Sequence, residues 1–267
     1  MNRLDNMTKG MAGAALGNVE IPSLKGKVSD EEWAARVDLA AAYRLVAHYG
    51  WDDVIFTHLS ARVPGEDEHF LLNPYQLMFE EITASSLVKV NKDGIPVEDT
   101  PFITAAPAFT VHSAIHMGVK DAHAVMHLHT AHGMAVSAHE DGLLPLTQHA
   151  MLVREEIAYH EYEGVAVDMS ERERILADLG DKSMMIFRNH GTLATGRTVG
   201  ECFMKIYQLE RACEAQVYAL SGVCSHPPQG APELVAQQAK MGAEMISAIA
   251  WSALLRKAYR LDPNFAT

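Results

Sequence analysis

Strand-like and helix-like segments alternate along this chain, and that alternation most constrains its fold. Segments with the apolar content or alternation of β-strands lie at residues 54–63, 70–72, 86–90, 124–128, 184–187 and 192–195. Segments with helical spacing of apolar residues lie at residues 30–49, 108–117, 131–139, 198–221 and 232–258. Because strands and helices are interleaved, the helices must pack against a shared sheet. We therefore predict a single α/β domain with helices on both faces of the sheet.

The domain is predicted to begin at residue 29. Ser29 and Glu32 form the pattern of a capping box, with Asp30 as an alternative cap, and the helical repeat that follows ends at Gly50. Residues 1–28 have no periodicity and are predicted to form a loose N-terminal arm. The remainder has no internal repeat or low-complexity linker, so residues 29–267 are assigned to one domain.

Composition and charge argue against several classes of partner. Of the 267 residues, 48% are hydrophobic and 21% are charged, which is typical of a globular chain with a sizeable core. The net charge of −12 argues against nucleic acid as the main partner, because such proteins carry a basic surface. Residues 100–119 lack Asp, Glu, Lys and Arg, but their prolines and histidines favour a buried soluble segment over a membrane span.

Cysteine usage and the N-terminus predict the compartment. The chain has only Cys202, Cys213 and Cys224, with no CxxC motif, so we expect free thiols in a reducing environment. The N-terminal residues also lack the apolar core of a secretory signal. These features predict a cytoplasmic protein that does not bind a membrane.

The 14 histidines are the most unusual feature of the composition, and most of them lie between residues 112 and 149. His127 and His129 are two residues apart at the end of a predicted strand, so both side chains face the same point. His190 follows another predicted strand, and Gly191 is expected to permit a sharp turn there. Three imidazoles can hold a divalent metal ion and leave positions open for substrate. The alternative is that these histidines are hydrogen-bonded structural residues.

Four landmarks in the same order make residues 33–222 resemble the class II aldolase/adducin head-domain family. They are Thr57-His58-Leu59-Ser60-Ala61-Arg62, the stretch from Asn73-Pro74-Tyr75 to Leu87-Val88, His127-x-His129 with Ala135-x-Ser137, and Asn189-His190-Gly191 before a long helix. The resemblance implies a three-layer α/β/α domain with a mostly antiparallel or mixed sheet. It also implies a homotetramer with sites between subunits. His127, His129 and His190 would then bind zinc or another divalent metal, with Fe(II), Mn and Co as alternatives.

One departure from the family concerns its catalytic base. Sugar-phosphate aldolases of this family carry a glutamate where this chain has Ala108, so the usual proton carrier is absent. The family tyrosine that donates a proton from the neighbouring subunit corresponds to His149, and histidine suits that task near neutral pH. His58 replaces a family asparagine that touches substrate. We predict His149 and His58 as catalytic residues; the alternative is a packed or interface role for His149 and a plain strand role for His58.

A second departure concerns phosphate binding. The family's Gly-Asn, Thr-Gly and Ser-Ser pairs correspond here to Thr57-His58, Tyr75-Gln76 and Ala106-Pro107. Phosphate sites rely on glycine amides and hydroxyls, which these residues supply poorly. The substrate is therefore predicted to be non-phosphorylated and to contact Tyr75, Gln76 and Ala108.

These features predict a metal-dependent carbon–carbon lyase. It would perform retro-aldol cleavage or decarboxylation on a small hydroxy or oxo compound, with an aromatic substrate as one option. Two alternatives stay open. The same three histidines suit Fe(II) and oxygen chemistry, as in an oxidative decarboxylase. The third interpretation is a non-catalytic, adducin-like binding module, although adducin-type heads lose metal ligands that this chain retains.

Overall fold

The computed structural model of the protein describes residues 21–104, 109–164 and 170–267. Its helices are α2 (Asp30–His48), α3 (Phe109–Gly118), α4 (Ala131–Ser137), α5 (Gln148–Val153), α6 (Glu171–Leu179), α7 (Val199–Leu220), α8 (Ala231–Ala239) and α9 (Ala243–Leu261). Its strands are β1 (His58–Arg62), β2 (His69–Leu72), β3 (Val88–Asn91), β4 (Ala124–Leu128), β5 (Ile157–His160), β6 (Met184–Phe187) and β7 (Gly191–Gly196). Short 3-10 helices lie at Phe79–Glu81, Arg154–Glu156 and Pro263–Ala266.

The described strands form a seven-stranded sheet in the order β3-β2-β1-β4-β7-β6-β5. Neighbouring strands are antiparallel except β5 and β6, which are parallel. Strand β4 is central, with His58 of β1 opposite His127 on one side and Leu193 of β7 opposite it on the other. The prediction of a mixed, mostly antiparallel sheet is confirmed.

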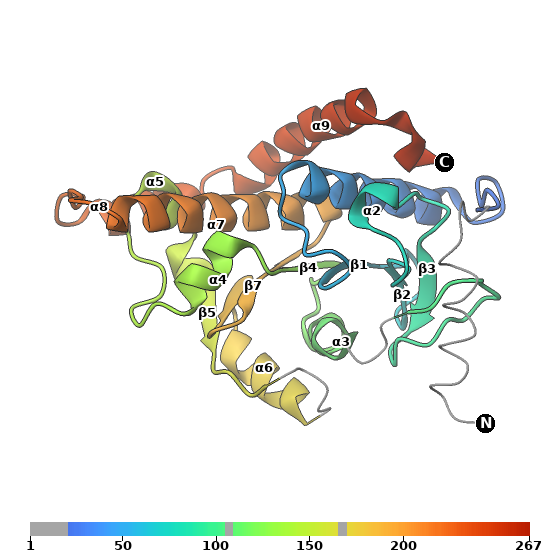
Figure 1. Cartoon of the computed structure of the whole chain (residues 1–267), viewed down its shortest axis with the longest axis horizontal. Helices are drawn as coiled ribbons and strands as arrows, with labels where there is room; N and C mark the ends of the chain where they lie inside the picture. The colour runs from blue at the N-terminus through green and yellow to red at the C-terminus, as the bar shows by residue number, and fades with distance from the viewer. Residues whose placement is uncertain (1–20, 105–108, 165–169) are drawn as a thin grey trace.

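Helices cover both faces of this sheet (Figure 1). Helices α2, α7 and α9 pack together on one face, while α3 and α6 pack on the other. Each interface has its own hydrophobic core. The larger core contains Tyr43, Phe203 and Trp251, and the smaller one contains Ile115 and Leu179. The three-layer α/β/α arrangement is therefore confirmed.

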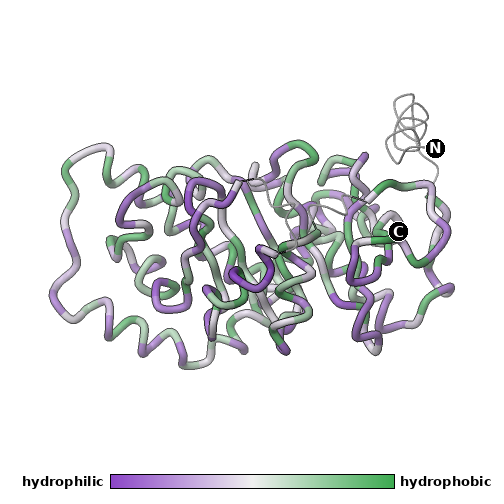
Figure 2. Tube along the Cα trace, turned by 90° about the horizontal axis from the view of Figure 1, so that it is seen from below, coloured by the Kyte–Doolittle hydropathy of each residue, from purple (hydrophilic) through white to green (hydrophobic). Residues whose placement is uncertain are grey.

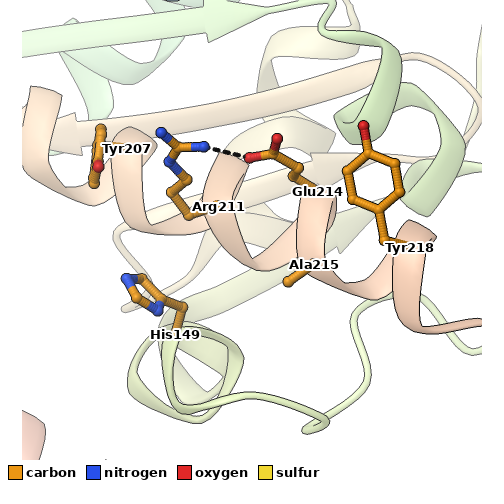
Figure 3. A pocket seen from close by; sticks show the side chains of 6 residues that line it. All are labelled: His149, Tyr207, Arg211, Glu214, Ala215 and Tyr218. Atoms are coloured by element: carbon orange, nitrogen blue, oxygen red, sulfur yellow. Dashed lines mark hydrogen bonds and ion pairs between the residues drawn. The ribbon is translucent and has the colours of Figure 1, made fainter. Parts of the chain in front are cut away.

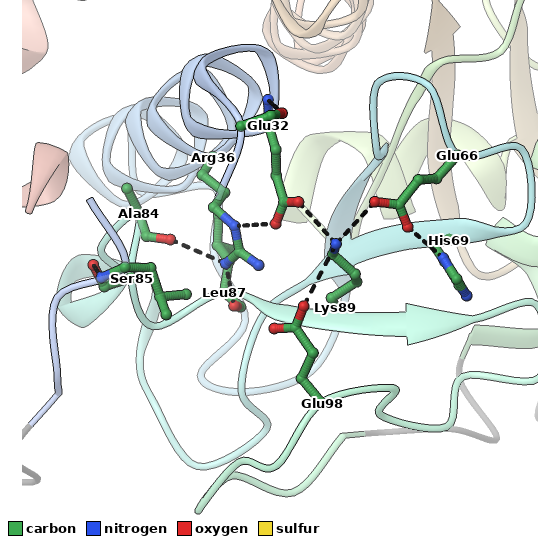
Figure 4. A network of polar contacts seen from close by, with 11 residues as sticks. Glu32, Arg36, Glu66, His69, Ala84, Ser85, Leu87, Lys89 and Glu98 are labelled. Carbon is green, nitrogen blue, oxygen red and sulfur yellow. Dashed lines mark hydrogen bonds and ion pairs between the residues drawn. The ribbon is translucent and has the colours of Figure 1, made fainter. Parts of the chain in front are cut away.

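Helix α2 begins where the sequence predicts, because the Ser29 hydroxyl accepts a hydrogen bond from the Glu32 backbone at 3.1 Å. The second half of the predicted capping box is wrong. The Glu32 carboxylate instead binds Arg36 Nε and Lys89 Nζ, each at 2.8 Å (Figure 4). Fully buried Arg36 also donates to two backbone carbonyls just before β3. Because these ionic groups are paired on several sides, they fix α2 against the edge of the sheet.

The structure corrects two predicted elements. The strand predicted for residues 54–63 is shortened to β1, because Val54 and Thr57 adopt positive φ angles of 56° and 66°. The helix predicted for residues 232–258 is two helices, α8 and α9, separated at Gly242 with a φ of 77°. Strand β5 and helices α5 and α6 were not predicted. Residues 1–20 of the predicted N-terminal arm lie outside the described residues.

The described helices include none that combines the length and apolar character of a membrane span. Hydrophilic and hydrophobic residues are instead interspersed along them (Figure 2). Cys202 and Cys213 are buried, Cys224 is partly exposed, and all three thiols are free, as predicted.

Candidate metal centre

Three histidine side chains converge at one end of the sheet. His127 lies near the end of β4, His129 follows that strand, and His190 lies in the turn between β6 and β7. The His129 Nε2 atom is 3.1 Å from His127 Nε2 and 2.8 Å from His190 Nε2. His127 is buried, whereas His129 and His190 are partly exposed, so solvent reaches the cluster from the side of these two residues. The structure thus brings together the three histidines that the sequence grouped.

The turn that carries His190 differs from the prediction. The residue with the left-handed backbone is Asn189, with a φ of 57°, a conformation that asparagine tolerates. Gly191 is required for another reason. A Cβ atom there would lie 2.4 Å from the carbonyl oxygen of Leu128 and 3.0 Å from the His129 ring. The absent side chain lets β7 approach β4 closely enough to bring His190 to the other two histidines.

Replacing Gly191 with alanine is therefore expected to separate the histidines. We expect Gly191→Ala to weaken Zn²⁺ binding at least about tenfold and to lower the free energy of unfolding by about 1–3 kcal/mol. Chelator competition and urea unfolding would measure these changes. Gly222→Ala is the matched control, since a Cβ there meets no atom within 4 Å. Equal Zn²⁺ affinity in the two variants would contradict the proposed packing role.

Hydrogen bonds behind two of the rings determine which nitrogen carries the proton. His127 Nδ1 lies 2.9 Å from the carbonyl oxygen of Thr192, and His129 Nδ1 lies 3.2 Å from Asp53 Oδ2. A carbonyl or carboxylate oxygen only accepts, so each Nδ1 donates its hydrogen. In the neutral rings the Nε2 atoms then bear lone pairs that face each other across 3.1 Å. Two facing lone pairs repel, whereas a cation between them would be bound by both.

Burial keeps two of the three imidazoles, those of His127 and His190, in the neutral form that binds metals. Burial lowers the pKa of His127 well below its ordinary value, and the charges of His190 and His129 add to the effect. Burial, with a contribution from His129, lowers the pKa of His190 to about 4. A metal ligand must be a neutral imidazole, so these two rings need lose no proton at neutral pH. Three nitrogen donors with an open side fit a divalent ion such as Zn²⁺.

Asp53 is a residue of the site that sequence reasoning missed. It accepts the hydrogen bond that orients the His129 ring, an arrangement common behind metal-binding histidines. The loop that presents it contains Val54 and Thr57 at positive φ angles, which are unfavourable for β-branched residues. Strained backbone of this kind is concentrated at functional sites. At positions 54 and 57 themselves the sequence has no glycine that would have revealed the strain.

A buried carboxyl links the two segments that carry the histidines. Glu210 of α7 accepts short hydrogen bonds from the hydroxyls of Thr130 and Thr192. Thr130 follows His129 in the chain, and the Thr192 carbonyl accepts the hydrogen bond from His127. Burial raises the pKa of Glu210 to about 7, while the two hydroxyls act to lower it. Glu210 thus fixes the backbone on both sides of the histidine cluster.

His58, predicted to be catalytic, lies beside the cluster, opposite His127 in the sheet. It is 5% exposed, and its ring stacks on His112 with centroids 3.9 Å apart. Its Nε2 atom is buried and has no hydrogen-bond partner within residues 21–104, 109–164 and 170–267. Behind it, Ser60 bridges His112 Nδ1 at 2.6 Å and His116 Nε2 at 2.7 Å. Burial lowers the pKa of His58 to about 3, with His129 contributing. At neutral pH the ring is therefore neutral, with one donor and one acceptor nitrogen.

The amino-acid sequence places this geometry in a known family. Residues 37–217 match the family model described as Class II Aldolase and Adducin N-terminal domain. The chain belongs to this family. It is 54% identical over 259 residues to a Caulobacter vibrioides protein named "Putative aldolase class 2 protein", a match that covers 96% of this chain and 100% of the relative.

Solved structures and an adducin extend the comparison. An aldolase II superfamily protein from Pseudomonas syringae is 48% identical, with a TM-score of 0.88 over 92% of this chain and 100% of the other. L-fuculose 1-phosphate aldolase from Glaciozyma antarctica has a TM-score of 0.76 at 24% identity, covering 95% and 97% of the two chains, and so shares the fold. Rat alpha-adducin is 45% identical over 189 residues, which is 70% of this chain and 26% of adducin.

His149, the other predicted catalytic residue of this class II aldolase family member, does not join the histidine cluster within one chain. It is exposed on α5 and faces α7 across a pocket of about 560 Å³ (Figure 3). The pocket is lined by His149, Tyr207, Arg211, Glu214, Ala215 and Tyr218. Arg211 pairs with Glu214 at 2.5 Å and lies over the Tyr207 ring. His149 thus lies on the exposed surface, at the edge of this pocket.

Of the three residues predicted to contact substrate, Tyr75 and Gln76 lie within the described residues. The Gln76 side chain accepts a hydrogen bond from the Ile103 backbone at 2.8 Å, and the Tyr75 backbone donates to the Ile103 carbonyl at 2.8 Å. These bonds fix the loop rather than linking it to the three histidines. Ala108 lies outside the described residues, so its predicted substrate contact stays a prediction.

Proposed function

We propose that this chain is a metal-dependent carbon–carbon lyase that acts by retro-aldol cleavage or decarboxylation. The observation that carries the proposal is the convergence of three Nε2 atoms. In His127 and His129 the Nδ1 atom donates to Thr192 or Asp53, which leaves a lone pair on Nε2 of the neutral ring. His127, His129 and His190 would hold the ion, with zinc the first choice and Mn, Co or Fe(II) as alternatives. A bound divalent ion would polarise a carbonyl or hydroxyl oxygen and stabilise negative charge as the carbon–carbon bond breaks.

The proposed substrate is a small non-phosphorylated hydroxy or oxo compound. Thr57-His58 replaces a glycine-containing phosphate clamp of the family, and the Thr57 hydroxyl is buried with no hydrogen-bond partner in the part of the chain that the structure describes. Gln76 uses its side-chain oxygen within its own loop. Neither position offers the cluster of amides and hydroxyls that a phosphate group requires. An aromatic substituent is one option, because Tyr75 stands where the sugar-phosphate contact would be.

Proton transfer is proposed to come from His149 of a neighbouring subunit in a homotetramer. Two points support this role: His149 is exposed, and the family resemblance implies a subunit boundary at the corresponding group. His58 would form a hydrogen bond to the substrate, since the neutral ring has an Nε2 atom without a partner among the described residues. Together the two histidines would divide the work of the glutamate that Ala108 replaces.

A subunit-mixing experiment tests the role of His149. We expect His149→Phe to lower turnover about 10²-fold or more while leaving metal binding unchanged. Mixing it with His127→Ala subunits should restore activity at about a quarter of the sites, because each variant supplies what the other lacks. Exposed His226→Phe is the control and should keep full activity. Absence of recovery in reassembled tetramers, or unchanged turnover in His149→Phe, would contradict the role.

A substrate screen tests the proposed function itself. Protein reconstituted with Zn²⁺, Mn²⁺, Co²⁺ or anaerobic Fe²⁺ would be offered β-hydroxy ketones, β-hydroxy acids, β-keto acids and their phosphorylated counterparts. Release of an aldehyde or CO₂, with kcat/KM at least about tenfold higher for the free compound, is the expected result. Preference for phosphorylated substrates would contradict the substrate proposal. Oxygen consumption with Fe²⁺ alone would replace the lyase with an oxidative decarboxylase.

The adducin relationship supports a second candidate function. At 45% identity over 189 residues, rat alpha-adducin is a close enough relative for a non-catalytic binding role to be considered. The hydrogen-bonded geometry of the three histidines favours the lyase. Their converging nitrogen lone pairs repel one another unless a cation binds between them, and a binding module does not require that cation. Failure of the chain to bind any divalent ion would favour the binding module.

A further inference from the structure

A second group of metal-ligating side chains lies where β5 meets α6. His160, the last residue of β5, is 2% exposed. Its Nε2 atom lies 3.5 Å from Glu171 Oε1 and 4.0 Å from Glu163 Oε1, and it is buried with no hydrogen-bond partner among the described residues. Candidate ligand atoms of these three residues all lie within 4.8 Å of one another. We propose that His160, Glu163 and Glu171 bind a second divalent cation of the zinc or manganese class.

The other contact of His160 shows which of its ring nitrogens donates a hydrogen. Its Nδ1 atom lies 2.7 Å from Asp178 Oδ2, a carboxylate that accepts the Nδ1 hydrogen. When the ring carries only this hydrogen, its Nε2 lone pair faces two further carboxylates, so a cation placed between them would be bound by all three groups. A carboxylate behind a histidine in this way is the usual arrangement that orients a metal-binding imidazole. Asp178 is thus the positioning residue of the second site.

The separation of His160 and Glu171 suits a shared cation better than a direct hydrogen bond. A charge-assisted N–H···O bond is about 2.7–2.9 Å long, shorter than the observed 3.5 Å. Two ligand atoms that each lie about 2.1 Å from a tetrahedral cation are about 3.4 Å apart. The side chains therefore stand at the spacing of two ligands of one ion.

The local charge also favours a dication. The carboxylates of Glu163, Glu171 and Asp178 lie around the His160 ring, and the guanidinium of Arg174 pairs with Glu163. Among the described residues of this cluster, the carboxylates thus outnumber the guanidinium three to one. Arg174 binds Glu163 through Nε at 2.7 Å and so holds that carboxylate in place. A bound divalent cation would balance the remaining charge.

Helix α6 carries two of the acidic residues, Glu171 and Asp178, on the side that packs against β5. Glu171 is its first residue and Asp178 lies seven positions later, so both face β5. The ring of Phe187 contacts His160 at 5.6 Å between centroids and His127 at 5.5 Å. The second site thus lies one aromatic ring away from the three-histidine cluster, with His160 and Glu171 buried and Glu163 exposed. Its inferred role is to hold α6 on β5, and this does not depend on the proposed lyase activity.

Equilibrium dialysis with Zn²⁺ tests the proposal in a His127→Ala background, which removes the first site. Chelator-stripped protein would be dialysed against micromolar Zn²⁺, and bound zinc counted by mass spectrometry. We expect one zinc ion per chain in His127→Ala, and the same number after Glu173→Gln, an exposed neighbour on α6. Adding Glu171→Gln should weaken this binding at least tenfold. Glu163→Gln, in a more exposed ligand, should do the same without disturbing the core.

Thermal unfolding supplies the second readout. Zn²⁺ should raise the midpoint of unfolding of His127→Ala, and this rise should be lost in the Glu171→Gln and Glu163→Gln forms but kept in the Glu173→Gln form. Absence of bound zinc in His127→Ala, or equal binding in all three glutamine variants, would overturn the second site. If the first site were the one in error, His127→Ala would bind as much zinc as the wild type, while Glu171→Gln would still lose one equivalent.

Discussion

His127→Ala is expected to bind one metal equivalent fewer than the wild type and to lose lyase turnover by about a thousandfold or more. His127 contributes the buried imidazole of the cluster, and its Nδ1 is already bonded to Thr192. Without it, His129 and His190 supply two ligands, too few to hold a catalytic ion. Loss of a Lewis acid removes several kcal/mol of transition-state stabilisation. Elemental analysis and turnover of the substrate found by screening would measure both effects.

The control for this prediction is His226→Ala, which removes an exposed histidine from the loop before α8. It should keep both metal and turnover, which shows that the loss is specific to the cluster. Circular dichroism would verify that His127→Ala is folded. Full metal content and full turnover in His127→Ala would contradict the three-histidine centre.

Replacing Glu210, which supports the segments that carry the metal ligands, is expected to weaken metal binding. Glu210→Ala leaves the Thr130 and Thr192 hydroxyls without their acceptor inside the core. We expect the free energy of unfolding to fall by about 2–4 kcal/mol. Zn²⁺ affinity should fall about 10–100-fold, the usual cost of losing a group that supports the ligands. Urea unfolding and chelator competition would measure these losses.

Glu210→Gln keeps the shape of the side chain but removes its titratable carboxyl. Burial raises the pKa of Glu210 to about 7, above its ordinary value of 4.5. Between these values the folded protein keeps a proton that the unfolded chain has lost, so this group makes the free energy of unfolding fall as pH rises from 4.5 to 7. Metal-free Glu210→Gln should lack that component. Exposed Glu233→Gln should retain it, and identical pH profiles for Glu210→Gln and wild type would contradict the buried-carboxyl assignment.

The sequence predicts the ligand-bearing elements well because their signals are local. The apolar run before His127 predicts β4, and the two-residue spacing to His129 predicts that both rings face one point. The mixed order of strands and helices also predicts the three layers that the structure contains.

The supporting residues could not be predicted, since their roles depend on contacts between distant segments. Asp53 reaches His129 across 76 residues, and Glu210 reaches Thr130 across 80. The backbone that places Asp53 bends at Val54 and Thr57, residue types that favour strands and so predicted one there. Such positions become visible only when the fold brings the segments together.

Anomalous X-ray diffraction from crystals grown with Zn²⁺ tests the metal centre most directly. Data collected on either side of the zinc absorption edge locate each bound ion independently of any activity. We predict an anomalous peak about 2.0–2.1 Å from the Nε2 atoms of His127, His129 and His190. Crystals in which zinc occupies other places, while these three imidazoles bind only water or one another, would contradict the account.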